Sequence, residues 1–498
     1  MPVTWRGGVL AALLGAAQTL ALVHTTLWPL PLLTAAWLAG RLDRATPRGG
    51  FVLGLAYGTA WIAAAVWWLF ISMHRYGGLA APLAAAAVLA LALALGLFLA
   101  LAGAAYARWR HGRAADAVLF AALWLLAELG RGMLFTGFPW GASGYTQVDA
   151  PLAVLAPWLG VYGMGAALAL AAAALARLVA SRWRAWPLAT GVALALGAAA
   201  AVGPAAFTRP AGEISVALLQ TNISQDEKFA AERMPATLAW LATALAQAEA
   251  ELVVAPETAV PLLPDQLEDA APGYWQALEA QFAQPGRAAL VGLPLGDYER
   301  GYRNAVAGLS AGPPYRYAKA HLVPFGEFIP TGFRWFTELM NIPLGDFDRG
   351  EARPPSFAVG AQRVAPNICY EDLFGEDLAR RFADAATAPT LLANLSNIGW
   401  FGDSIAIPQH LNISRLRALE FERSMLRATN TGATAIIGPD GRVQALLTPH
   451  TRGVLTGRAQ GREGLTPYAA WAARFGLWPL VLGALALAFA TSRPWRRP

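Results

Sequence analysis

The stretch PNICYED at residues 366–372 contains Cys369, the only cysteine in the 498-residue chain. Two more reactive residue types stand in other short segments, Glu257 in APET and Lys319 in RYAKAHLVPFGEFIP. A thiolate is a nucleophile, and a neighbouring carboxylate can take its proton as a general base. A nearby lysine favours both the thiolate and the oxyanion of a tetrahedral intermediate. If the fold brings the three side chains together, they are equipped for acyl transfer through a thioester.

Each of these residues also has an ordinary structural explanation. Cysteine is among the most buried residue types, so Cys369 could be a small apolar residue of a core. Glu257 could stabilise the start of a helix, and Lys319 could be a solvated surface charge. The elements that carry the three residues therefore decide between chemistry and packing.

Residues 212–466 form the polar part of the chain, where short β-branched runs alternate with helical stretches. Continuous apolar strands alternating with helices predict a sheet covered by helices on its faces. The expected strands are 214–222, 251–258, 288–295, 304–310, 363–371, 389–397 and 433–441. The expected helices are 226–250, 266–284, 373–386 and 408–428. This pattern places Cys369 at a strand-to-helix turn and Glu257 at a strand end, so the reactive groups could converge at one sheet edge.

The rest of the chain is strongly apolar. Hydrophobic residues make up 56% and charged residues only 14%, whereas soluble domains usually carry about 25% charged residues. A membrane helix needs about 20 apolar residues. The expected spans are 8–24, 27–41, 51–73, 79–106, 115–130, 150–176, 185–203 and 470–490. The prediction is a membrane α-helical bundle of about eight spans, with seven in 1–211, a catalytic domain at 212–466, and one span and a tail in 467–498.

Arginines in the loops between these spans predict the orientation. One side carries Arg6, Arg41, Arg44, Arg48, Arg108, Arg110, Arg113, Arg177, Arg182, Arg184, Arg493, Arg496 and Arg497. The short loops of the other side carry only Arg75 and Arg131. The positive-inside rule therefore predicts cytoplasmic termini and a polar domain on the far side of the membrane. Because the net charge of +6 follows these loops, it indicates membrane topology and not nucleic-acid binding.

Three further residues have two interpretations each. Glu128 and Arg131 in ELGRGMLFTGFPW could be a simple ion pair at a helix end. They could also contact a substrate, because ionisable residues at a membrane boundary are candidate site residues. Trp335 belongs to the aromatic cluster FRWF, which could be ordinary core or could dip into the lipid leaflet.

A single cysteine excludes a cysteine-cluster metal site, and we expect no metal and no cofactor.

Taken in order, APETAV, YAKAHLVPFGEFIP and NICYED resemble the Glu–Lys–Cys pattern of the nitrilase superfamily. The segments ELGRGMLFTGFPW, NIGWFGDSIAIPQH and RATNTGATAIIGPDG resemble its membrane branch, the apolipoprotein N-acyltransferases of bacterial lipoprotein maturation. The resemblance covers nearly the whole chain and implies an αββα sandwich for the polar domain. It implies that Glu257 is the general base, Lys319 stabilises the oxyanion and Cys369 is the nucleophile.

The resemblance also implies roles for neighbouring residues. Glu327 in GEFIP would hold the lysine or share in proton handling, and Tyr370 and Glu371 would support the pocket. Trp400 would shape a mobile loop over the site. Where the family carries a tryptophan, the segment NISQDEKF has Phe229, which retains an aromatic for packing but loses the indole N–H.

The leading hypothesis is therefore a transferase of the bacterial inner membrane with its catalytic domain in the periplasm. It would move a fatty acyl chain from a phospholipid to the α-amino group of a diacylglyceryl-modified N-terminal cysteine in an apolipoprotein. The alternative is a membrane-tethered nitrilase-type amidase, although a hydrolase of small polar amides needs at most one anchor. A transporter or scaffold is a third reading, which the scarcity of charged residues within the spans disfavours.

Overall fold

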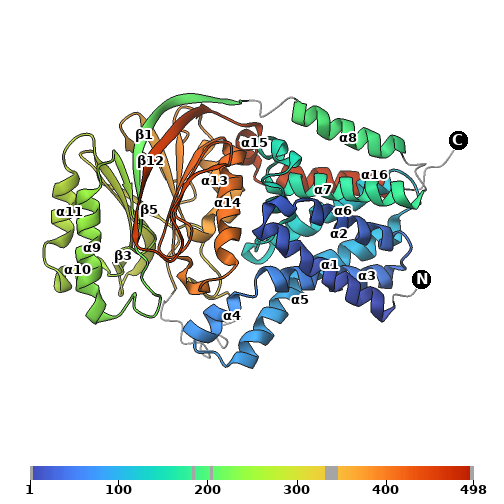
Figure 1. The fold of residues 1–498 in the computed structure, drawn as a ribbon, viewed down its shortest axis with the longest axis horizontal. Coiled ribbons are helices and arrows are strands. Elements are labelled where there is room, and N and C mark those ends of the chain that lie inside the picture. The colour runs from blue at the N-terminus through green and yellow to red at the C-terminus, as the bar shows by residue number, and fades with distance from the viewer. Residues whose placement is uncertain (1–3, 182–185, 202–205, 331, 333–345, 494–498) are drawn as a thin grey trace. The chain divides into compact units, whose positions relative to one another are not determined.

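The computed structural model describes residues 4–181, 186–201, 206–330, 332 and 346–493 (Figure 1). The chain divides into two compact units. The helical unit comprises Met1–Leu69, Ala81–Ala205 and Phe475–Pro498, and the sheet unit comprises Phe70–Ala80 and Ala206–Arg474. The short segment 70–80 thus groups with the sheet unit, although helices of the other unit precede and follow it in the sequence.

The helical unit is built from long apolar helices that pack closely through small residues. Its helices are α1 (Trp5–Val23), α2 (Pro29–Leu42), α3 (Pro47–Ala65), α5 (Ala81–Trp109), α6 (Asp116–Met133), α7 (Ala156–Ala180), α8 (Trp186–Ala201) and α16 (Trp478–Ser492). A Cβ atom on Gly54 of α3 would lie 2.4 Å from the carbonyl oxygen of Leu99 in α5. Glycine is therefore required for this approach, as is common where membrane helices pack.

The expected number of about eight spans is not confirmed. Among the described residues, four helices are long and apolar enough to cross a membrane, or up to six if each bent pair forms one span. The expected span 27–41 corresponds to α2, which has only 14 residues and is shorter than the roughly 20 residues that a bilayer core requires. Of the expected span 185–203, the structure describes α8, and the residues on either side of this helix lie outside the described ranges.

The expected C-terminal span at 470–490 is divided in the structure. Helix α15 (Pro467–Phe475) meets α16 at an angle of 92°. Gly476 between them has a φ of 56°, a left-handed conformation that glycine adopts without strain. Tyr468 and Ala472 of α15 are buried in the helix core of the sheet unit. Of the expected span, α16 therefore belongs to the helical unit, whereas α15 packs in the sheet unit.

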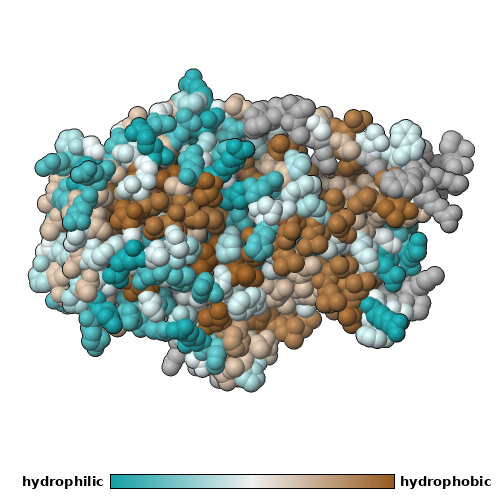
Figure 2. All heavy atoms as spheres, in the orientation of Figure 1, coloured by the Kyte–Doolittle hydropathy of each residue, from teal (hydrophilic) through white to brown (hydrophobic). Residues whose placement is uncertain are grey.

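Apolar side chains lie on the surface of the helical unit, and Figure 2 shows hydrophobic residues gathered over its helices. The exposed ones include Leu13, Leu20, Leu93, Leu101 and Leu485. Contiguous apolar surface of this extent is not tolerated in water and is expected where a protein faces lipid. The helical unit therefore has the surface of a membrane domain.

The sheet unit contains two six-stranded sheets. The first has the order β12-β1-β2-β3-β4-β5 and the second β11-β10-β9-β8-β7-β6. The strands are β1 (Thr208–Gln220), β2 (Leu252–Val254), β3 (Ala288–Asp297), β4 (Gly301–Leu309), β5 (Tyr315–Ala318), β6 (Phe357–Val359), β7 (Gln362–Ile368), β8 (Leu391–Ser396), β9 (Ser424–Thr429), β10 (Ala435–Ile437), β11 (Val443–Leu446) and β12 (Gly453–Gly464). The central strands of each sheet run parallel, β1 with β2 and β3, and β7 with β8 and β9.

Side chains of the two sheets pack against each other in one core, which includes Leu218, Val254, Ile368, Leu395 and Leu426. Helices cover the outer faces. On the first sheet these are α9 (Met234–Gln247), α10 (Pro264–Ala270) and α11 (Tyr274–Phe282), and on the second α13 (Gly375–Ala379), α14 (Ala406–Phe421) and α15. The layers are thus helix, sheet, sheet and helix, which confirms the αββα sandwich.

One predicted element is wrong in part. The expected helix 408–428 ends at Phe421, where Glu422 adopts a left-handed φ of 47°. The following residues form β9, which pairs in parallel with β8 and is completely buried. Tertiary pairing overrides the helical pattern of the segment, because the core offers this sequence a central strand position.

Candidate active site

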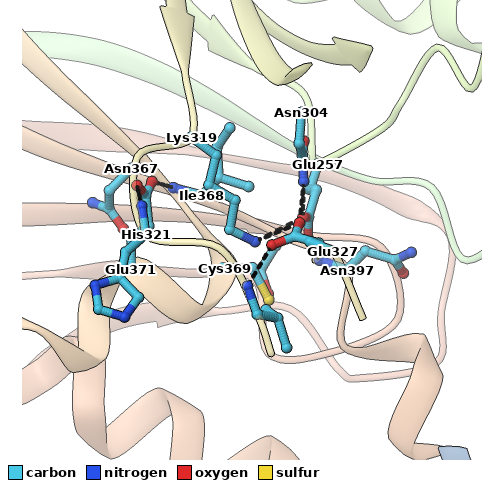
Figure 3. Close-up of polar contacts among 12 residues, drawn as sticks. Glu257, Asn304, Lys319, His321, Glu327, Asn367, Ile368, Cys369, Glu371 and Asn397 are labelled. Atoms are coloured by element: carbon cyan, nitrogen blue, oxygen red, sulfur yellow. Dashed lines mark hydrogen bonds and ion pairs between the residues drawn. The ribbon is translucent and has the colours of Figure 1, made fainter. Parts of the chain in front are cut away.

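The structure brings Glu257, Lys319 and Cys369 together (Figure 3). Glu257 follows β2, Lys319 follows β5, and Cys369 follows β7 directly. Strands β2 and β5 belong to one sheet and β7 to the other, so the site lies where strand ends of both sheets meet. The Nζ atom of Lys319 is 3.6 Å from Oε1 of Glu257.

Two carboxylates surround the ammonium group of Lys319. Its Nζ donates a hydrogen bond of 2.8 Å to Oε1 of Glu327. The Nδ2 of Asn304 bridges the pair, donating to Oε1 of Glu257 at 2.7 Å and of Glu327 at 2.8 Å. Burial alone would lower the pKa of Lys319, but Glu327 and then Glu257 outweigh it and raise that pKa above its ordinary value. The lysine therefore stays protonated as a fixed positive charge.

Glu257 is held at both carboxylate oxygens. Its Oε2 accepts a hydrogen bond of 2.7 Å from the main-chain N–H of Asn397, which follows β8. Its Oε1 accepts the hydrogen bond from Nδ2 of Asn304 and faces Nζ of Lys319. The side chain is 7% exposed, so water does not compete freely for it. This anchoring fixes the carboxylate for proton transfer with a neighbouring group.

Cys369 occupies a strained turn between β7 and the 3₁₀ helix Cys369–Leu373. Its φ is 50°, a left-handed conformation that costs a residue with a side chain roughly 1–3 kcal/mol. The Asn394 side chain donates to its carbonyl oxygen at 3.1 Å, and the Ser396 hydroxyl donates to its sulfur at 3.3 Å. The surrounding structure therefore keeps the thiol turned out of the strand and toward the site.

The environment of Cys369 keeps its thiol protonated. Burial, followed by the charge of Glu257, raises the pKa of Cys369 to about 12, against the opposing influence of Lys319 and Ser396. The side chain nevertheless retains some accessible surface, as a nucleophile requires. A thiol of this kind cannot act as a preformed thiolate at neutral pH. It needs a base that takes its proton as it attacks.

Glu371 ties the Lys319 segment to the Cys369 turn. Its Oε1 accepts from the main-chain N–H groups of Ala320 at 2.7 Å and His321 at 3.1 Å, and its Oε2 accepts from Ile368 N–H at 2.7 Å. Burial is the main reason that the pKa of Glu371 is raised. Tyr370 is also buried and lies edge-on to the His321 ring. Glu371 thus holds the turn through its hydrogen bonds, and the implied support of a pocket by Tyr370 and Glu371 stays a prediction.

The residues expected to bind or gate substrate are spread more widely. Trp400 lies in the 3₁₀ helix Ile398–Phe401, edge-to-face with Tyr76 at a ring distance of 5.7 Å. Phe229 is 42% exposed. Trp335 lies outside the described residues. The gating roles of these three residues stay predictions.

Glu128 and Arg131 lie within the helical unit and are buried there. Glu128 accepts the main-chain N–H of Ser143 at 2.7 Å, and Arg131 donates to the carbonyl oxygen of Trp140 at 2.7 Å. The guanidinium also lies over the ring of Trp61. These contacts tie α6 to the loop that follows it, and contact with a substrate stays a prediction.

Sequence reasoning missed four polar residues of the site. Asn304, Ser396 and Asn397 lie on or next to segments that were correctly predicted as strands, but amides and hydroxyls give no sequence signal for chemistry. Lys228 is the fourth, and its Nζ donates to the main-chain oxygen of Glu257 at 3.1 Å.

A second buried network lies behind the Cys369 turn. Asp372 contacts Nε2 of His410 at 2.9 Å and lies 3.5 Å from Nη1 of Arg427. Arg427 donates to Oδ1 of Asn394 at 2.9 Å, and the same asparagine donates to the Cys369 carbonyl oxygen. This chain of contacts connects α14 and β9 to the turn that presents the thiol.

Two family models match the chain: the apolipoprotein N-acyltransferase N-terminal domain at residues 14–174 and the carbon–nitrogen hydrolase family at residues 215–468. An apolipoprotein N-acyltransferase of Verminephrobacter eiseniae is 52% identical, over 91% of this chain and 89% of its own. An apolipoprotein N-acyltransferase of Ralstonia nicotianae is 46% identical, over 92% of this chain and 88% of its own. A solved carbon–nitrogen hydrolase superfamily protein from Xanthomonas campestris is 19% identical, with a TM-score of 0.39, over 55% of this chain and 97% of its own. By its identity to curated relatives along nearly its whole length, the chain belongs to the apolipoprotein N-acyltransferase family.

Proposed function

We propose that this chain transfers a fatty acyl chain from a phospholipid, through a thioester on Cys369, to the α-amino group of a diacylglyceryl-modified cysteine at the N-terminus of an apolipoprotein. The convergence of Cys369, Glu257 and Lys319 at the strand ends carries the proposal. It is supported by the names of the relatives and by the match of the helical region to their N-terminal domain.

In the first half-reaction Cys369 attacks the ester carbonyl carbon of the donor lipid while Glu257 takes the thiol proton. A C–S bond forms and the carbonyl oxygen becomes an oxyanion, which the ammonium of Lys319 stabilises. Collapse of this intermediate breaks the C–O ester bond. Glu257 returns its proton to the departing alkoxide, so a lysophospholipid leaves and the acyl chain remains on sulfur.

In the second half-reaction the neutral α-amine of the acceptor attacks the thioester carbonyl. Glu257 takes a proton from the amine, the C–S bond breaks, and that proton returns to the sulfur of Cys369. The product is an amide and the enzyme regains its free thiol. Because the lysophospholipid leaves before the acceptor attacks the acyl-enzyme, the scheme is ping-pong.

A membrane-tethered amidase would use the same residues with water as the acceptor. Long apolar helices in the helical unit favour the transferase, since both of its proposed substrates are lipids. A long acyl chain drawn into water would cost about 0.8 kcal/mol per methylene. We accordingly propose that the catalytic domain, at 212–466, takes its donor directly from the bilayer.

The proposed location is the bacterial inner membrane, with the catalytic domain in the periplasm and both termini in the cytoplasm. The arginine distribution over the short loops supports this orientation. A reporter that is active only outside the cytoplasm tests it. Fused near Gly312 it should be active, and fused near Arg493 it should be silent; the opposite pattern would reverse the topology.

Intact mass analysis tests the reaction itself. Purified protein incubated with phospholipid should gain the mass of one acyl chain at Cys369, and added acceptor lipopeptide should discharge it as an amide. Acyl gain followed by release of free fatty acid, with or without the acceptor, would instead show that water discharges the thioester. Failure to gain any acyl chain would contradict the transferase and leave the amidase, whose substrate is a small amide.

A further inference from the structure

The chain has only two lysines, Lys228 and Lys319, among 38 lysine and arginine residues. Both are buried, with exposed fractions of 3% and 1%. Both also contact Glu257: Lys319 lies 3.6 Å from its carboxylate, and Lys228 donates to its main-chain oxygen at 3.1 Å. The proposed mechanism uses Lys319 alone, which leaves the second buried ammonium without a role.

Lysine and arginine are not equivalent at such a position. Arginine spreads five N–H donors over a rigid plane, whereas lysine places a compact charge on a flexible stem and loses its proton more readily when buried. The chain uses arginine for every other strongly basic position. Its two lysines thus stand where a small positive charge fits beside Glu257.

Among the charged groups that contact Glu257, directly or through Lys319, the charges do not balance without Lys228; Asp372 and Arg427, the pair behind the Cys369 turn, offset each other. Glu257 and Glu327 contribute two negative charges and Lys319 one positive charge. One negative charge therefore remains before the sulfur itself becomes negative, which opposes attack. Lys228, whose Nζ donates to the main-chain oxygen of Glu257 at 3.1 Å, supplies a second positive charge and brings the sum for these four groups to zero.

Lys228 is not occupied by an ion pair of its own. In the part of the chain that the structure describes, no carboxylate oxygen pairs directly with its Nζ, and its one hydrogen-bond acceptor is the Glu257 main-chain oxygen. A buried ammonium in this state is costly unless nearby charge compensates it. Burial lowers the pKa of Lys228 to about 8, while Glu257 and Cys369 act in the opposite direction.

The loop that carries Lys228 is held in place on both sides. Gln225 accepts a hydrogen bond of 3.0 Å from the side chain of Asn397, whose main-chain N–H binds the Glu257 carboxylate. Asp226 pairs with Arg75 at 2.6 Å. The other charge of the loop, Glu227, faces Arg233 at 3.3 Å on the exposed side. The charges of Asp226 and Glu227 are therefore matched elsewhere, and the ammonium of Lys228 contacts Glu257.

We propose that Lys228 is a positioning residue for acyl transfer, which fixes the main chain of Glu257 and supplies the second positive charge that offsets the two carboxylates as Cys369 becomes negative. The inference rests on the proposed function for the reaction it serves. Its effect on the thiol, however, does not depend on any lipid.

The rate of Cys369 alkylation by iodoacetamide at pH 8 tests the charge, because alkylation requires the thiolate. Lys228→Met should slow it about tenfold, the change that accompanies a rise of one in the thiol pKa. Lys228→Gln keeps a hydrogen-bond donor for the Glu257 oxygen but no charge, and it should be equally slow. Arg233→Met removes an exposed positive charge of the same segment and should stay within about twofold of wild type. Wild-type alkylation in Lys228→Gln would overturn the proposal.

A second measurement follows the titration of the Lys228 ammonium by NMR. Protein labelled with ¹³C at the lysine ε carbon contains two such side-chain signals, and Lys228→Met identifies them. The Lys228 signal should titrate near pH 8 in wild type and at lower pH in Glu257→Gln, which removes a stabilising negative charge. A midpoint near that of a free lysine, unmoved by Glu257→Gln, would overturn the proposal.

The pH dependence of the acylation rate connects the role of Lys228 with the proposed acyl transfer. Wild type should lose rate as the pH rises through about 8, and Lys228→Met should be slower and lack this alkaline fall. If no variant or wild type forms an acyl-enzyme while the alkylation and titration results hold, the proposed function fails and the role of Lys228 for the thiol stands. If Lys228→Gln transfers acyl chains as wild type does, the inference fails and the proposed function stands.

Discussion

Two groups of buried charges lie on either side of the Cys369 turn, and they differ in how completely they are satisfied. The reaction cluster comprises Glu257, Glu327, Lys319 and Lys228. The support cluster comprises Asp372, His410 and Arg427. In the support cluster each residue bonds to the others, whereas in the reaction cluster Lys228 contacts only a main-chain oxygen.

The support cluster is arranged so that its charges do not change. Arg427 donates to Nδ1 of His410 at 2.8 Å, so the ring proton lies on Nε2 and faces Asp372. Burial and Arg427 lower the pKa of His410, which keeps the ring neutral. Burial opposes the charge on Asp372, but His410 and Arg427 outweigh it and lower the pKa of that carboxyl. Every group thus has one stable protonation state.

The reaction cluster is arranged in the opposite way. The pKa of Lys228 is lowered to about 8, close to neutral pH. The pKa of Cys369, next to this cluster, is raised, so the thiol depends on a neighbouring base to lose its proton. Groups with strongly shifted pKa values gather at functional sites more often than elsewhere. The contrast supports the proposal that the first cluster takes part in the reaction, whereas the contacts of the second one hold the turn.

The largest expected effect is at the nucleophile. Cys369→Ser should abolish acyl-enzyme formation, since removal of a catalytic nucleophile can cost on the order of 10⁶-fold in rate. The change is nearly isosteric, so the melting temperature should stay close to wild type. Intact mass after incubation with phospholipid measures the acylation, and an acyl adduct of comparable yield in the variant would place the nucleophile elsewhere.

The second largest loss of acylation rate is expected for Glu257→Gln, because the amide keeps the size of the carboxylate but cannot accept the thiol proton. The expected loss is roughly 10²–10⁴-fold in the acylation rate, the usual contribution of a general base. Single-turnover acylation measures it. Asp372→Asn, which also replaces a buried carboxylate, serves as the matched control; an equal loss in both variants would remove the distinction between the clusters.

Lys319→Met should cost about 10²–10³-fold, the range for loss of one oxyanion donor. Since the lysine also neutralises Glu257 and Glu327, the thiol should become harder to ionise as well. The acylation rate should therefore fall together with the alkylation rate of Cys369. A variant that alkylates slowly but acylates normally would separate the lysine from the oxyanion.

The smallest effect on the reaction, and a large one on stability, is expected in the support cluster. Asp372→Asn leaves Arg427 without its counter-charge, which typically costs about 3–5 kcal/mol of unfolding free energy in a buried pair. The fraction that stays folded should acylate at a rate near that of wild type. Denaturant unfolding and single-turnover acylation measure the two quantities, and unchanged stability would contradict the contacts described for Asp372.

Asp372→Asn should also change how the stability of the protein depends on pH. The folded-state pKa of Asp372 is lowered, so its contribution to stability is fully present above pH about 4 and is lost as the pH falls through the lowered value. Wild type should therefore lose stability on acidification more steeply than Asp372→Asn. Parallel acid-unfolding curves for the two proteins would contradict this assignment.

Much of this protein could be predicted from sequence, because the signals are local. The continuous apolar strands predicted a sheet covered by helices, and the family resemblance implied the sandwich. The reactive residues Glu257 and Cys369 were predicted at strand ends that the structure contains. The helix expected at 408–428 was partly wrong, because the pairing of β9 with β8 is a long-range interaction that local propensity does not carry. The span count was not confirmed, because hydropathy reports apolar length and does not show where a helix bends or ends.

The sequence by itself determined which reactive groups this chain carries, since residue types and their order identify a thiol, a carboxylate and a cation. Only the tertiary structure decided how these groups are charged. Asn304, Asn397 and Lys228 come from different elements and act through distances of about 3 Å to Glu257. Such contacts follow from the packing of two sheets against each other, and no spacing along the chain encodes them.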